Sequence, residues 1–354
     1  MNIGLLARKT LFSQPGGDTV QVVNTAEALQ RYGHRTFIVK AGDALPEDLD
    51  LLHFFNIGRP ADAMPYFVRF KGKKVISTIF VDYKKADKQR FPWLYSVIGS
   101  HGMEYVKTLA RGLNKSDRWP QWSYLNRGQR KSMIHLLKHC DTIITSSMSE
   151  LQRVSQWAKL PGKSLRDRHR LVPLGIDTVF IDQPRTEAPR TGLLMVGRLE
   201  YLKNQHSVIR WAKAHGWPLT VVGDPNINQN EYYQRCLEEA GPLTRFLPFQ
   251  NQSEVIQLMD EHKVFLVPSF FESYSLVAWE AAARGMAVIA NRVPDMSETL
   301  EPIAEFANFD SEDEVIRVIQ HELTQLNPRT KKSQAWFKNY TWDVIGEKII
   351  EAYT

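Results

Sequence analysis

The stretch that decides the fold is KVFLVPSFFESYSLVAWEAAARGMAVIAN, residues 263–291. It opens with an apolar run at residues 263–269, turns through small and polar residues, and continues into an Ala-rich segment and a second apolar run at residues 286–291. A short continuous apolar run is typical of a strand buried on both faces, and a helix is the usual crossover between two parallel strands. The stretch therefore predicts a strand-helix-strand unit of a parallel sheet.

The same alternation of strand and helix continues on both sides of this unit. Other predicted strands lie at residues 1–7, 35–41, 50–56, 73–83, 140–147, 192–199, 218–224 and 244–249, with helix-length segments between most of them. The segment 170–192 is rich in proline, has no helical period, and is expected to link two domains. Because 354 residues are long for one domain, we predict two doubly wound α/β domains. The last predicted helix has one apolar side, formed by Trp342, Ile345, Ile349 and Tyr353. We expect this side to pack against the rest of the protein.

Basic charge is concentrated in one region. Residues 69–131 contain 15 Lys and Arg against four acidic residues, which gives this region a net charge of +11. Because the whole chain has a net charge of +6, the remaining residues sum to −5. Aromatic side chains interleave with these cations. Such a surface suits anionic lipid headgroups or nucleic acid, and it is equally typical of a solvated face over an aromatic core.

The composition also indicates a compartment. No stretch approaches the roughly 18 apolar residues of a membrane-spanning helix, and the first residues lack the features of a secretory signal. Cys140 and Cys236 are the only cysteines, so a disulfide framework is excluded. The expected location is the cytoplasm.

Two glutamates flank the turn at residues 273–275. Glu272 precedes it, and Glu280 follows Ser275 by five residues on the predicted helix. A helix N-terminus at the carboxyl end of a parallel strand favours a phosphate, and a carboxylate can accept hydrogen bonds from sugar hydroxyls. The pair could therefore bracket a nucleotide diphosphate sugar. A capping glutamate and a solvated one would give the same pattern.

Two further motifs favour the nucleotide. Arg198 and Lys203 follow the predicted strand at 192–199 and could neutralise a diphosphate. Gly16 and Gly17 form a small-residue loop after the first predicted strand.

Taken together, these motifs resemble the retaining GT-B glycosyltransferases of glycosyltransferase family 4. The family's E-x7-E signature matches Glu272 and Glu280, its strand-GR-x4-K element matches Gly197 to Lys203, and its Gly-Gly loop matches Gly16 and Gly17. The resemblance covers almost all of the second domain and the first to about Asp82, whereas residues 84–138 match nothing familiar.

The resemblance implies a GT-B architecture of two Rossmann-like domains with a cleft between them. Residues 1–175 would form the acceptor-binding domain, 176–335 the nucleotide-sugar-binding domain, and 336–354 a helix that crosses back to the first domain. The implied catalytic residues are Arg198, Lys203 and Glu272. The implied donor-binding residues are Gly16, Gly17, Arg198, Lys203, Glu272, Ser273, Tyr274, Ser275, Leu276 and Glu280.

Four positions depart from the family pattern. Serines stand at 273 and 275 where glycine is common, and Pro173-Leu174-Gly175 replaces Pro-Asn-Gly. The family's histidine after the strand STI is also missing. On the acceptor side, Asp82 or His101 substitutes for it, or no side chain does.

The resemblance implies front-face retention, in which a donor phosphate oxygen takes the acceptor proton, with no metal and no cofactor. The only D-x-D, Asp48 to Asp50, is interpreted as an acidic strand entry, and His135 with His139 as a helix surface without a third ligand.

The predicted function is transfer of a hexose-type sugar from a UDP- or GDP-sugar to a glycan, glycolipid or lipid-linked acceptor, at the inner face of a membrane bound through residues 69–131. A non-catalytic scaffold is the alternative, and a nucleic-acid-binding protein is disfavoured because it leaves the donor motifs unexplained. A nicotinamide dehydrogenase is excluded because no G-x-G-x-x-G turn is present.

Overall fold

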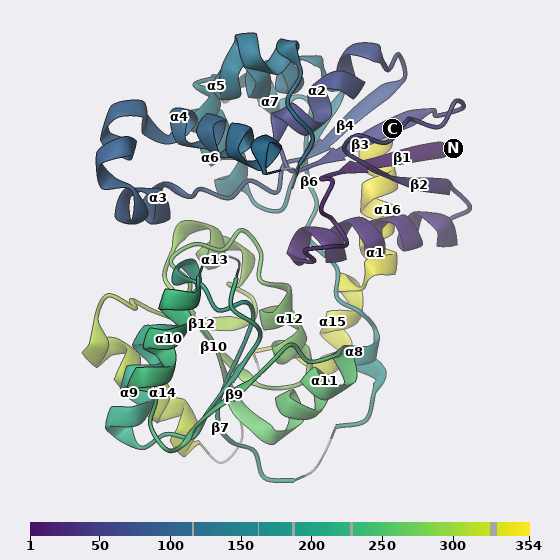
Figure 1. Cartoon of the computed structure of the whole chain (residues 1–354). Helices are drawn as coiled ribbons and strands as arrows, with labels where there is room; N and C mark the ends of the chain where they lie inside the picture. The colour runs from purple at the N-terminus through teal and green to yellow at the C-terminus, as the bar shows by residue number, and fades with distance from the viewer. Residues whose placement is uncertain (115–116, 162, 186–187, 227–228, 326–330) are drawn as a thin grey trace. The chain divides into compact units, whose positions relative to one another are not determined.

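The computed structural model describes residues 1–114, 117–161, 163–185, 188–226, 229–325 and 331–354, with the side chains of residues 85, 86 and 89 left out (Figure 1). The chain divides into two compact units. The first contains Met1–Gly175 and Trp342–Thr354, and the second contains Ile176–Thr341.

The first unit is an α/β unit built on a parallel sheet. Its elements are β1 (Asn2–Ala7), α1 (Gly17–Arg31), β2 (Arg35–Lys40), β3 (Leu51–Phe55), α2 (Pro60–Arg69), β4 (Lys73–Ser77), α3 (Lys84–Arg90), α4 (Pro92–Leu113), α5 (Trp122–His139), β5 (Thr142–Thr145), α6 (Met148–Ala158), α7 (Lys163–Arg166), β6 (His169–Leu171) and α16 (Trp342–Tyr353). The strand order is β2-β1-β3-β4-β5-β6. All pairs are parallel.

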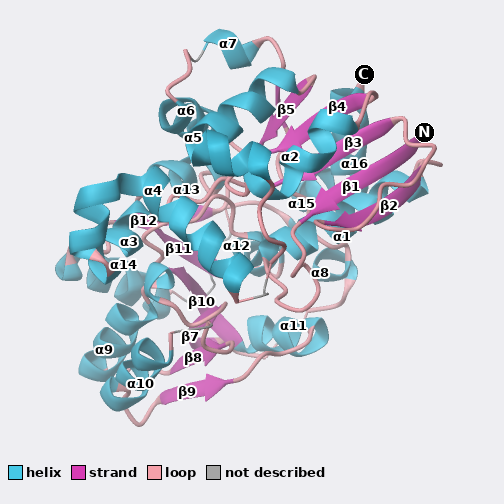
Figure 2. Cartoon of the chain, turned by 45° about the horizontal axis from the view of Figure 1, so that its top comes forward, coloured by secondary structure: helices cyan, strands magenta, loops and turns pink. Residues whose placement is uncertain are grey.

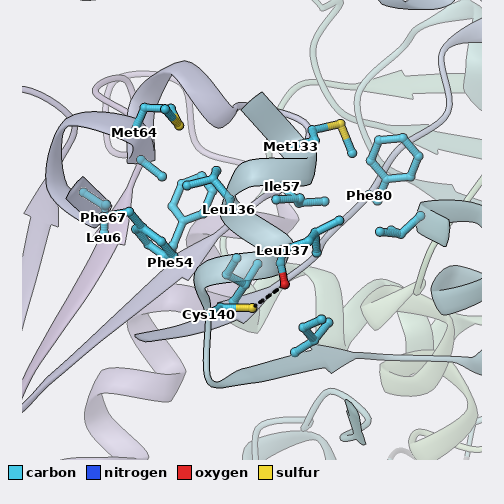
Figure 3. Packing of buried hydrophobic residues seen from close by; sticks show 14 of the residues in the cluster. Leu6, Phe54, Ile57, Met64, Phe67, Phe80, Met133, Leu136, Leu137 and Cys140 are labelled. Carbon is cyan, nitrogen blue, oxygen red and sulfur yellow. Dashed lines mark hydrogen bonds between the residues drawn. The ribbon is translucent and has the colours of Figure 1, made fainter. Parts of the chain in front are cut away.

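Apolar side chains between the sheet, α2 and α5 form the main core of this unit. Figure 3 shows Leu6 and Phe54 of the strands together with Phe67 of α2 and Leu136 of α5. Phe54 is fully buried and meets Phe67 edge to face, with ring centroids 6.2 Å apart. The strands are apolar on both faces because helices cover both faces.

Helix α16 covers the other face beside α1 (Figure 1). The predicted stripe of Trp342, Ile345, Ile349 and Tyr353 is confirmed, since all four side chains are at most 5% exposed. Close approach explains Gly346, because a Cβ there would lie 2.9 Å from the Cβ of Ala28.

A buried series of hydrogen bonds fixes the end of α16 to the sheet. His53 of β3 is fully buried and bonds to the Tyr353 hydroxyl through Nδ1 (2.7 Å) and to the Ser77 hydroxyl through Nε2 (2.8 Å). Burial lowers the pKa of His53 to about 3. The imidazole is therefore neutral at ordinary pH.

The second unit repeats the architecture. Its elements are α8 (Val179–Asp182), β7 (Thr191–Val196), η1 (Tyr201–Lys203), α9 (Gln205–His215), β8 (Leu219–Val222), α10 (Asn230–Glu239), β9 (Thr244–Leu247), α11 (Gln252–Glu261), β10 (His262–Val267), α12 (Leu276–Ala283), β11 (Ala287–Asn291), α13 (Pro294–Thr299), β12 (Ala304–Ala307), α14 (Glu312–Thr324), α15 (Gln334–Phe337) and η2 (Lys338–Tyr340). The parallel strand order is β12-β11-β10-β7-β8-β9.

Helices cover both faces of this sheet as well (Figure 2). Side chains of α9, α10 and α14 pack on one face around Met195 and Ile289. Helices α11 and α12 contact β10 from the other side. Cys140 and Cys236 are free thiols, each buried in its own unit.

The predicted α/β fold with two Rossmann-like sheets is confirmed, and the predicted strands are present at shorter length. β6 and β12 were not predicted. The expectation of no helix in 170–192 was wrong at α8, where the Asp177 carboxylate accepts a bond from the Val179 amide (3.1 Å) and begins a helical turn. No helix in the described part of the chain combines the length and apolar character needed to cross a bilayer.

Candidate functional site

The order of the second sheet creates a switch point between β7 and β10. These strands are adjacent and parallel, with Leu193 opposite Val264, while the sheet continues to β8 on one side and β11 on the other. Connections that leave such a pair diverge, so ligands of open α/β sheets bind beyond the carboxyl ends of the two strands. The segments that follow β7 and β10 contain Arg198, Lys203 and Glu272.

The turn after β7 requires close backbone approach. Gly197 has a φ of 150°, and a Cβ on Gly223 would lie 2.3 Å from the Gly197 carbonyl oxygen. The next residue, Arg198, is exposed. Its guanidinium makes no hydrogen bond or ion pair with any described residue. Among the residues that the structure describes, Arg198 is therefore a cation without a partner at the switch point.

Lys203 ends η1 and forms an ion pair with Glu272. The Lys203 Nζ bonds to Glu272 Oε2, and the Ser269 hydroxyl lies 3.3 Å from the same oxygen. The side chains of Lys203 and Glu272 are 28% and 16% exposed, so solvent still reaches both. The structure thus brings together two of the predicted donor-site residues.

Two buried asparagines hold the loop that carries Glu272. Asn204 donates from Nδ2 to the Pro268 carbonyl (3.3 Å), and Asn291 donates to the Ser269 carbonyl (3.1 Å). Asn204 has a φ of 52°, a left-handed conformation that asparagine tolerates better than most residues. The sequence analysis missed both residues, although Asn204 directly follows Lys203 and Asn291 ends a predicted strand.

Helix α12 begins at this loop, with Ser275 as the N-cap. The Ser275 carbonyl accepts bonds from the amides of Ala278 and Trp279, but its hydroxyl makes no capping bond. Within the described chain, no partner occupies the amides of Leu276 and Val277. The start of α12 therefore offers free N–H donors and the positive end of the helix dipole.

Glu280 lies further along α12 and is partly buried. Burial, and secondarily the charge of Asp177, raise the pKa of Glu280 to about 8. No donor among the described residues bonds to its carboxyl group. Glu280 is therefore largely protonated at neutral pH, with its hydrogen-bonding capacity unused.

In the first unit, Gly16 and Gly17 form the start of α1. Gly16 is the N-cap in an extended conformation, and its carbonyl accepts a bond from the Thr19 amide (2.9 Å). A Cβ at Gly17 would meet nothing within 4 Å, so packing in this unit does not require a glycine there.

Arg8 organises the loop before Gly16 and was not identified from the sequence. Its guanidinium makes two bonds to the Asp18 carboxylate, at 2.6 and 3.0 Å, and one to the Gln14 carbonyl at 2.6 Å. These hydrogen bonds of the Arg8 guanidinium hold the loop before α1 against the first turn of that helix.

The two candidates for the acceptor side do not contact one another in the described structure. Asp82 accepts a bond from the Lys84 amide (2.9 Å). His101 packs on Trp157, with ring centroids 3.8 Å apart. Burial, followed by the charges of Arg130 and Lys159, lowers the pKa of His101, which favours its neutral form.

A buried carboxylate instead holds the loop after β4. Glu150 is 1% exposed and accepts bonds from the Thr78 hydroxyl (2.6 Å) and the Phe80 amide (2.8 Å). Between them lies Ile79 with a φ of 39°, which is strained for a β-branched residue. Sequence reasoning missed Glu150 because its partners lie about 70 residues away.

The residues considered as metal ligands have structural partners. Asp50 accepts a bond from the Asn2 amide (2.7 Å), and the Asp48 carbonyl accepts one from the Asn2 side chain (2.8 Å). His135 and His139 stack with ring centroids 4.1 Å apart. The described residues contain no cluster of three or more His, Cys, Asp or Glu able to hold a metal ion.

Comparison with known proteins finds similarity to a family of glycosyltransferases in the part of the chain that contains these motifs. A family model described as "Glycosyl transferases group 1" matches residues 180–320, which contain Arg198, Lys203, Glu272 and Glu280. The chain is 30% identical over 173 residues to a glycogen synthase of Mycobacterium tuberculosis, an alignment that covers 47% of this chain and 41% of that protein. The chain thus matches less than half the length of that curated relative.

Other matches extend over nearly the whole chain, including the following two. An uncharacterized glycosyltransferase of Methanocaldococcus jannaschii is 21% identical over 400 residues, covering 96% of this chain and 94% of that protein. A sucrose-phosphate synthase from Thermosynechococcus elongatus has a similar structure, with a TM-score of 0.73 and 15% identity over 100% of this chain and 98% of that chain.

Proposed function

We propose that the chain, which has the GT-B fold, is a member of the glycosyl transferases group 1 family and a retaining hexosyltransferase that uses a nucleotide diphosphate sugar. A UDP- or GDP-sugar is the donor, and a hydroxyl group of a glycan, glycolipid or lipid-linked saccharide is the acceptor. The product belongs to polysaccharide or glycoconjugate synthesis.

The observation that carries this proposal is the convergence of charge at the β7–β10 switch point. Arg198 is an unpaired cation in the described structure, Lys203 pairs with Glu272, and α12 begins beside them with free amides. A diphosphate is the ligand class that uses two cations and a helix N-terminus together.

We assign the remaining donor residues from the resemblance of their motifs to those of the family. Glu280 accepts hydrogen bonds from the ribose hydroxyls, and Glu272 accepts hydrogen bonds from hydroxyls of the transferred sugar. The backbone of residues 273–276 contacts the sugar and phosphates. Gly16 and Gly17 are the first unit's contribution to donor-phosphate binding.

Catalysis consists of stabilising the departing diphosphate. The bond between the anomeric carbon and the phosphate oxygen breaks, while the acceptor oxygen bonds to the same face of that carbon. A donor phosphate oxygen takes the acceptor proton, so the configuration is retained without an enzyme nucleophile or a metal. Arg198, Lys203 and the α12 amides provide fixed positive charge where negative charge develops.

The acceptor is assigned to the first unit. Asp82 and His101 are the proposed acceptor-side residues, and the lowered pKa of His101 leaves it neutral and able to accept a hydrogen bond. The basic region 69–131 supports peripheral binding to an anionic membrane surface, at its cytoplasmic face, where a lipid-linked acceptor is available.

The first experiment measures thermal stabilisation by a panel of UDP- and GDP-sugars, with and without EDTA, for the wild-type chain and Glu280→Ala. A sugar nucleotide that raises the melting temperature of the wild type in EDTA, but not that of Glu280→Ala, supports the donor site and identifies the base. Glu238→Ala, which removes an exposed glutamate on α10, is the matched control and should respond like the wild type. No stabilisation by any donor would favour a non-catalytic scaffold.

A further inference from the structure

We propose that one exposed element of the first unit, formed by α3 and the beginning of α4, inserts into the surface of an anionic lipid bilayer. We call it the α3–α4 tip and define it by the side chains of Lys84, Lys88, Arg90, Phe91, Trp93 and Val97. The inference rests on the proposed function, because a lipid-linked acceptor requires the enzyme at a membrane, and it selects one site within region 69–131.

The tip exposes large apolar side chains next to one another. Trp93 is 76% exposed, Val97 is 65% exposed, and Phe91 is 42% exposed. Trp93 and Val97 are four residues apart, so they lie on the same side of the helix. The regular helix ends at Gly99, which has non-helical angles (φ 62°, ψ −175°), and Pro92–Ile98 therefore forms a short helix of its own.

The exposed charges of the tip are all positive among the side chains that the structure describes. Lys84, Lys88 and Arg90 are exposed. From residue 83 to residue 103 the sequence contains a single acidic residue, Asp87. Asp87 is buried and bonds to the Lys107 ammonium at 2.8 Å, so its charge does not offset the exposed cations.

Cations and rings alternate on this surface. The Arg90 guanidinium lies 5.2 Å from the centre of the Phe91 ring, and the Lys88 ammonium lies 5.6 Å from the centre of the Tyr95 ring. Aromatic rings favour the headgroup layer, and lysine and arginine favour anionic headgroups. A lipid surface satisfies both sets of groups at the same depth.

The tip is held in shape by α4 itself. Lys107 bonds to Asp87 of α3 and to Glu104 (2.7 Å), and its ammonium lies 4.9 Å from the centre of the Tyr83 ring. Helices α3 and α4 pack side by side. The apolar side chains are therefore held by an ordered element, and their insertion into a bilayer costs little additional conformational entropy.

Trp122 provides a matched comparison within the same basic region. It is also 76% exposed, at the start of α5. Four residues later, however, stands the polar Asn126, whereas Trp93 is followed by Val97 at that distance. The apolar pair occurs at the tip and not at Trp122.

The test is sedimentation of the full chain with vesicles of phosphatidylcholine alone or mixed with phosphatidylglycerol. We expect the wild type to bind the anionic vesicles and to lose binding at high salt. The variants Trp93→Ser/Val97→Ser and Lys84→Glu/Lys88→Glu/Arg90→Glu should each weaken this binding by about tenfold or more. Trp122→Ser should stay within about twofold of the wild type.

Three results would overturn the proposal: equal binding of the wild type to neutral and anionic vesicles, unchanged binding of both tip variants, or an equal loss in Trp122→Ser. Retention on duplex DNA with no vesicle binding would assign the charge to nucleic acid instead. Melting temperatures establish that each variant is folded. Donor-induced stabilisation of the same variants tests the proposed function separately, because these side chains do not belong to the donor site.

Discussion

Lys203 and Glu272, 69 residues apart in the sequence, form an ion pair beyond the carboxyl ends of β7 and β10. The cation proposed for the diphosphate is thus bonded to the carboxylate proposed for the sugar. Donor binding must divide this pair between two parts of one ligand.

This competition predicts opposite effects of Glu272→Ala on binding and on transfer. Removing the carboxylate frees Lys203 and deletes a negative charge, so a nucleoside diphosphate without sugar should bind more tightly. Sugar transfer should fall by roughly 100-fold or more, because the sugar loses its acceptor. Calorimetry with the diphosphate and a turnover assay with the sugar nucleotide measure the two effects. Weaker diphosphate binding would contradict the competition.

Lys203→Ala should instead weaken binding of both ligands and lower turnover by roughly 100-fold to 1,000-fold, as expected for the loss of one preorganised positive charge. Since each single change leaves the other charged group unpaired, the double variant should lose less than the sum of the two. Additive losses would show that the pair does not act as a unit.

The raised pKa of Glu280 predicts proton release on donor binding. Ribose hydroxyls donate to the ionised carboxyl, so binding favours the form that is in the minority below pH 8. Affinity should rise with pH, by at most about tenfold per pH unit, and level off near pH 8. Calorimetry in two buffers of different ionisation enthalpy measures the released proton.

Glu280→Gln is the control for that measurement. The amide keeps the shape of the side chain but does not titrate, so binding should be weaker and independent of pH between 6 and 8. A pH dependence that persists in Glu280→Gln would assign the proton to another group.

Gly17→Ala separates folding from function. A Cβ at this position meets nothing within 4 Å, and alanine is the better helix former, so stability should stay constant or rise by up to about 1 kcal/mol. Turnover should nevertheless fall at least about tenfold, because the methyl group occupies the proposed approach of the donor phosphate. Thermal melting and kinetics of the same sample provide the comparison, and full activity would remove Gly17 from the site.

The neutral buried His53 predicts acid sensitivity. Its folded pKa of about 3 lies below the unfolded value of 6.5, so the unfolded chain binds the proton more readily. His53 thus contributes stability that is complete above pH 6.5 and declines as the pH falls towards 3, by roughly 1.4 kcal/mol per pH unit. Urea unfolding between pH 7 and pH 5 should lose about 2 kcal/mol from this group.

His53→Gln should reduce this pH dependence while lowering stability at pH 7. Replacing the exposed His215 of α9 in the same way should change neither. An unaltered slope in His53→Gln would show that other groups cause the acid sensitivity.

The sequence predicted the elements that have strong local patterns. The β10–α12–β11 unit was recognised because two continuous apolar runs flank an Ala-rich segment that ends at Gly285. β6 (His-Arg-Leu) and β12 (Ala-Glu-Phe-Ala) escaped because each is short and neither contains a continuous apolar run. Such short strands are defined by the neighbour they pair with more than by their own residues.

The charged members of the candidate site were predicted, but the residues that hold them were not. Asn204 and Asn291 act through carbonyls on another segment, and Glu150 acts through Thr78 and Phe80. These contacts depend on which strands become neighbours, and a single sequence does not state that order. The raised pKa of Glu280 likewise depends first on burial in the folded unit and second on the charge of Asp177, about a hundred residues earlier.

The position of α16 also has a consequence for the order in which the chain is made. The second unit, residues 176–341, is continuous, whereas the first unit includes residues from both sides of it. During synthesis the second unit is therefore complete while the first still lacks the helix that covers α1 and the Tyr353 hydroxyl that partners His53. In the nascent first unit, the surface that α16 covers stays exposed until residues 342–354 have been synthesised. We expect a chaperone to bind this surface during that interval.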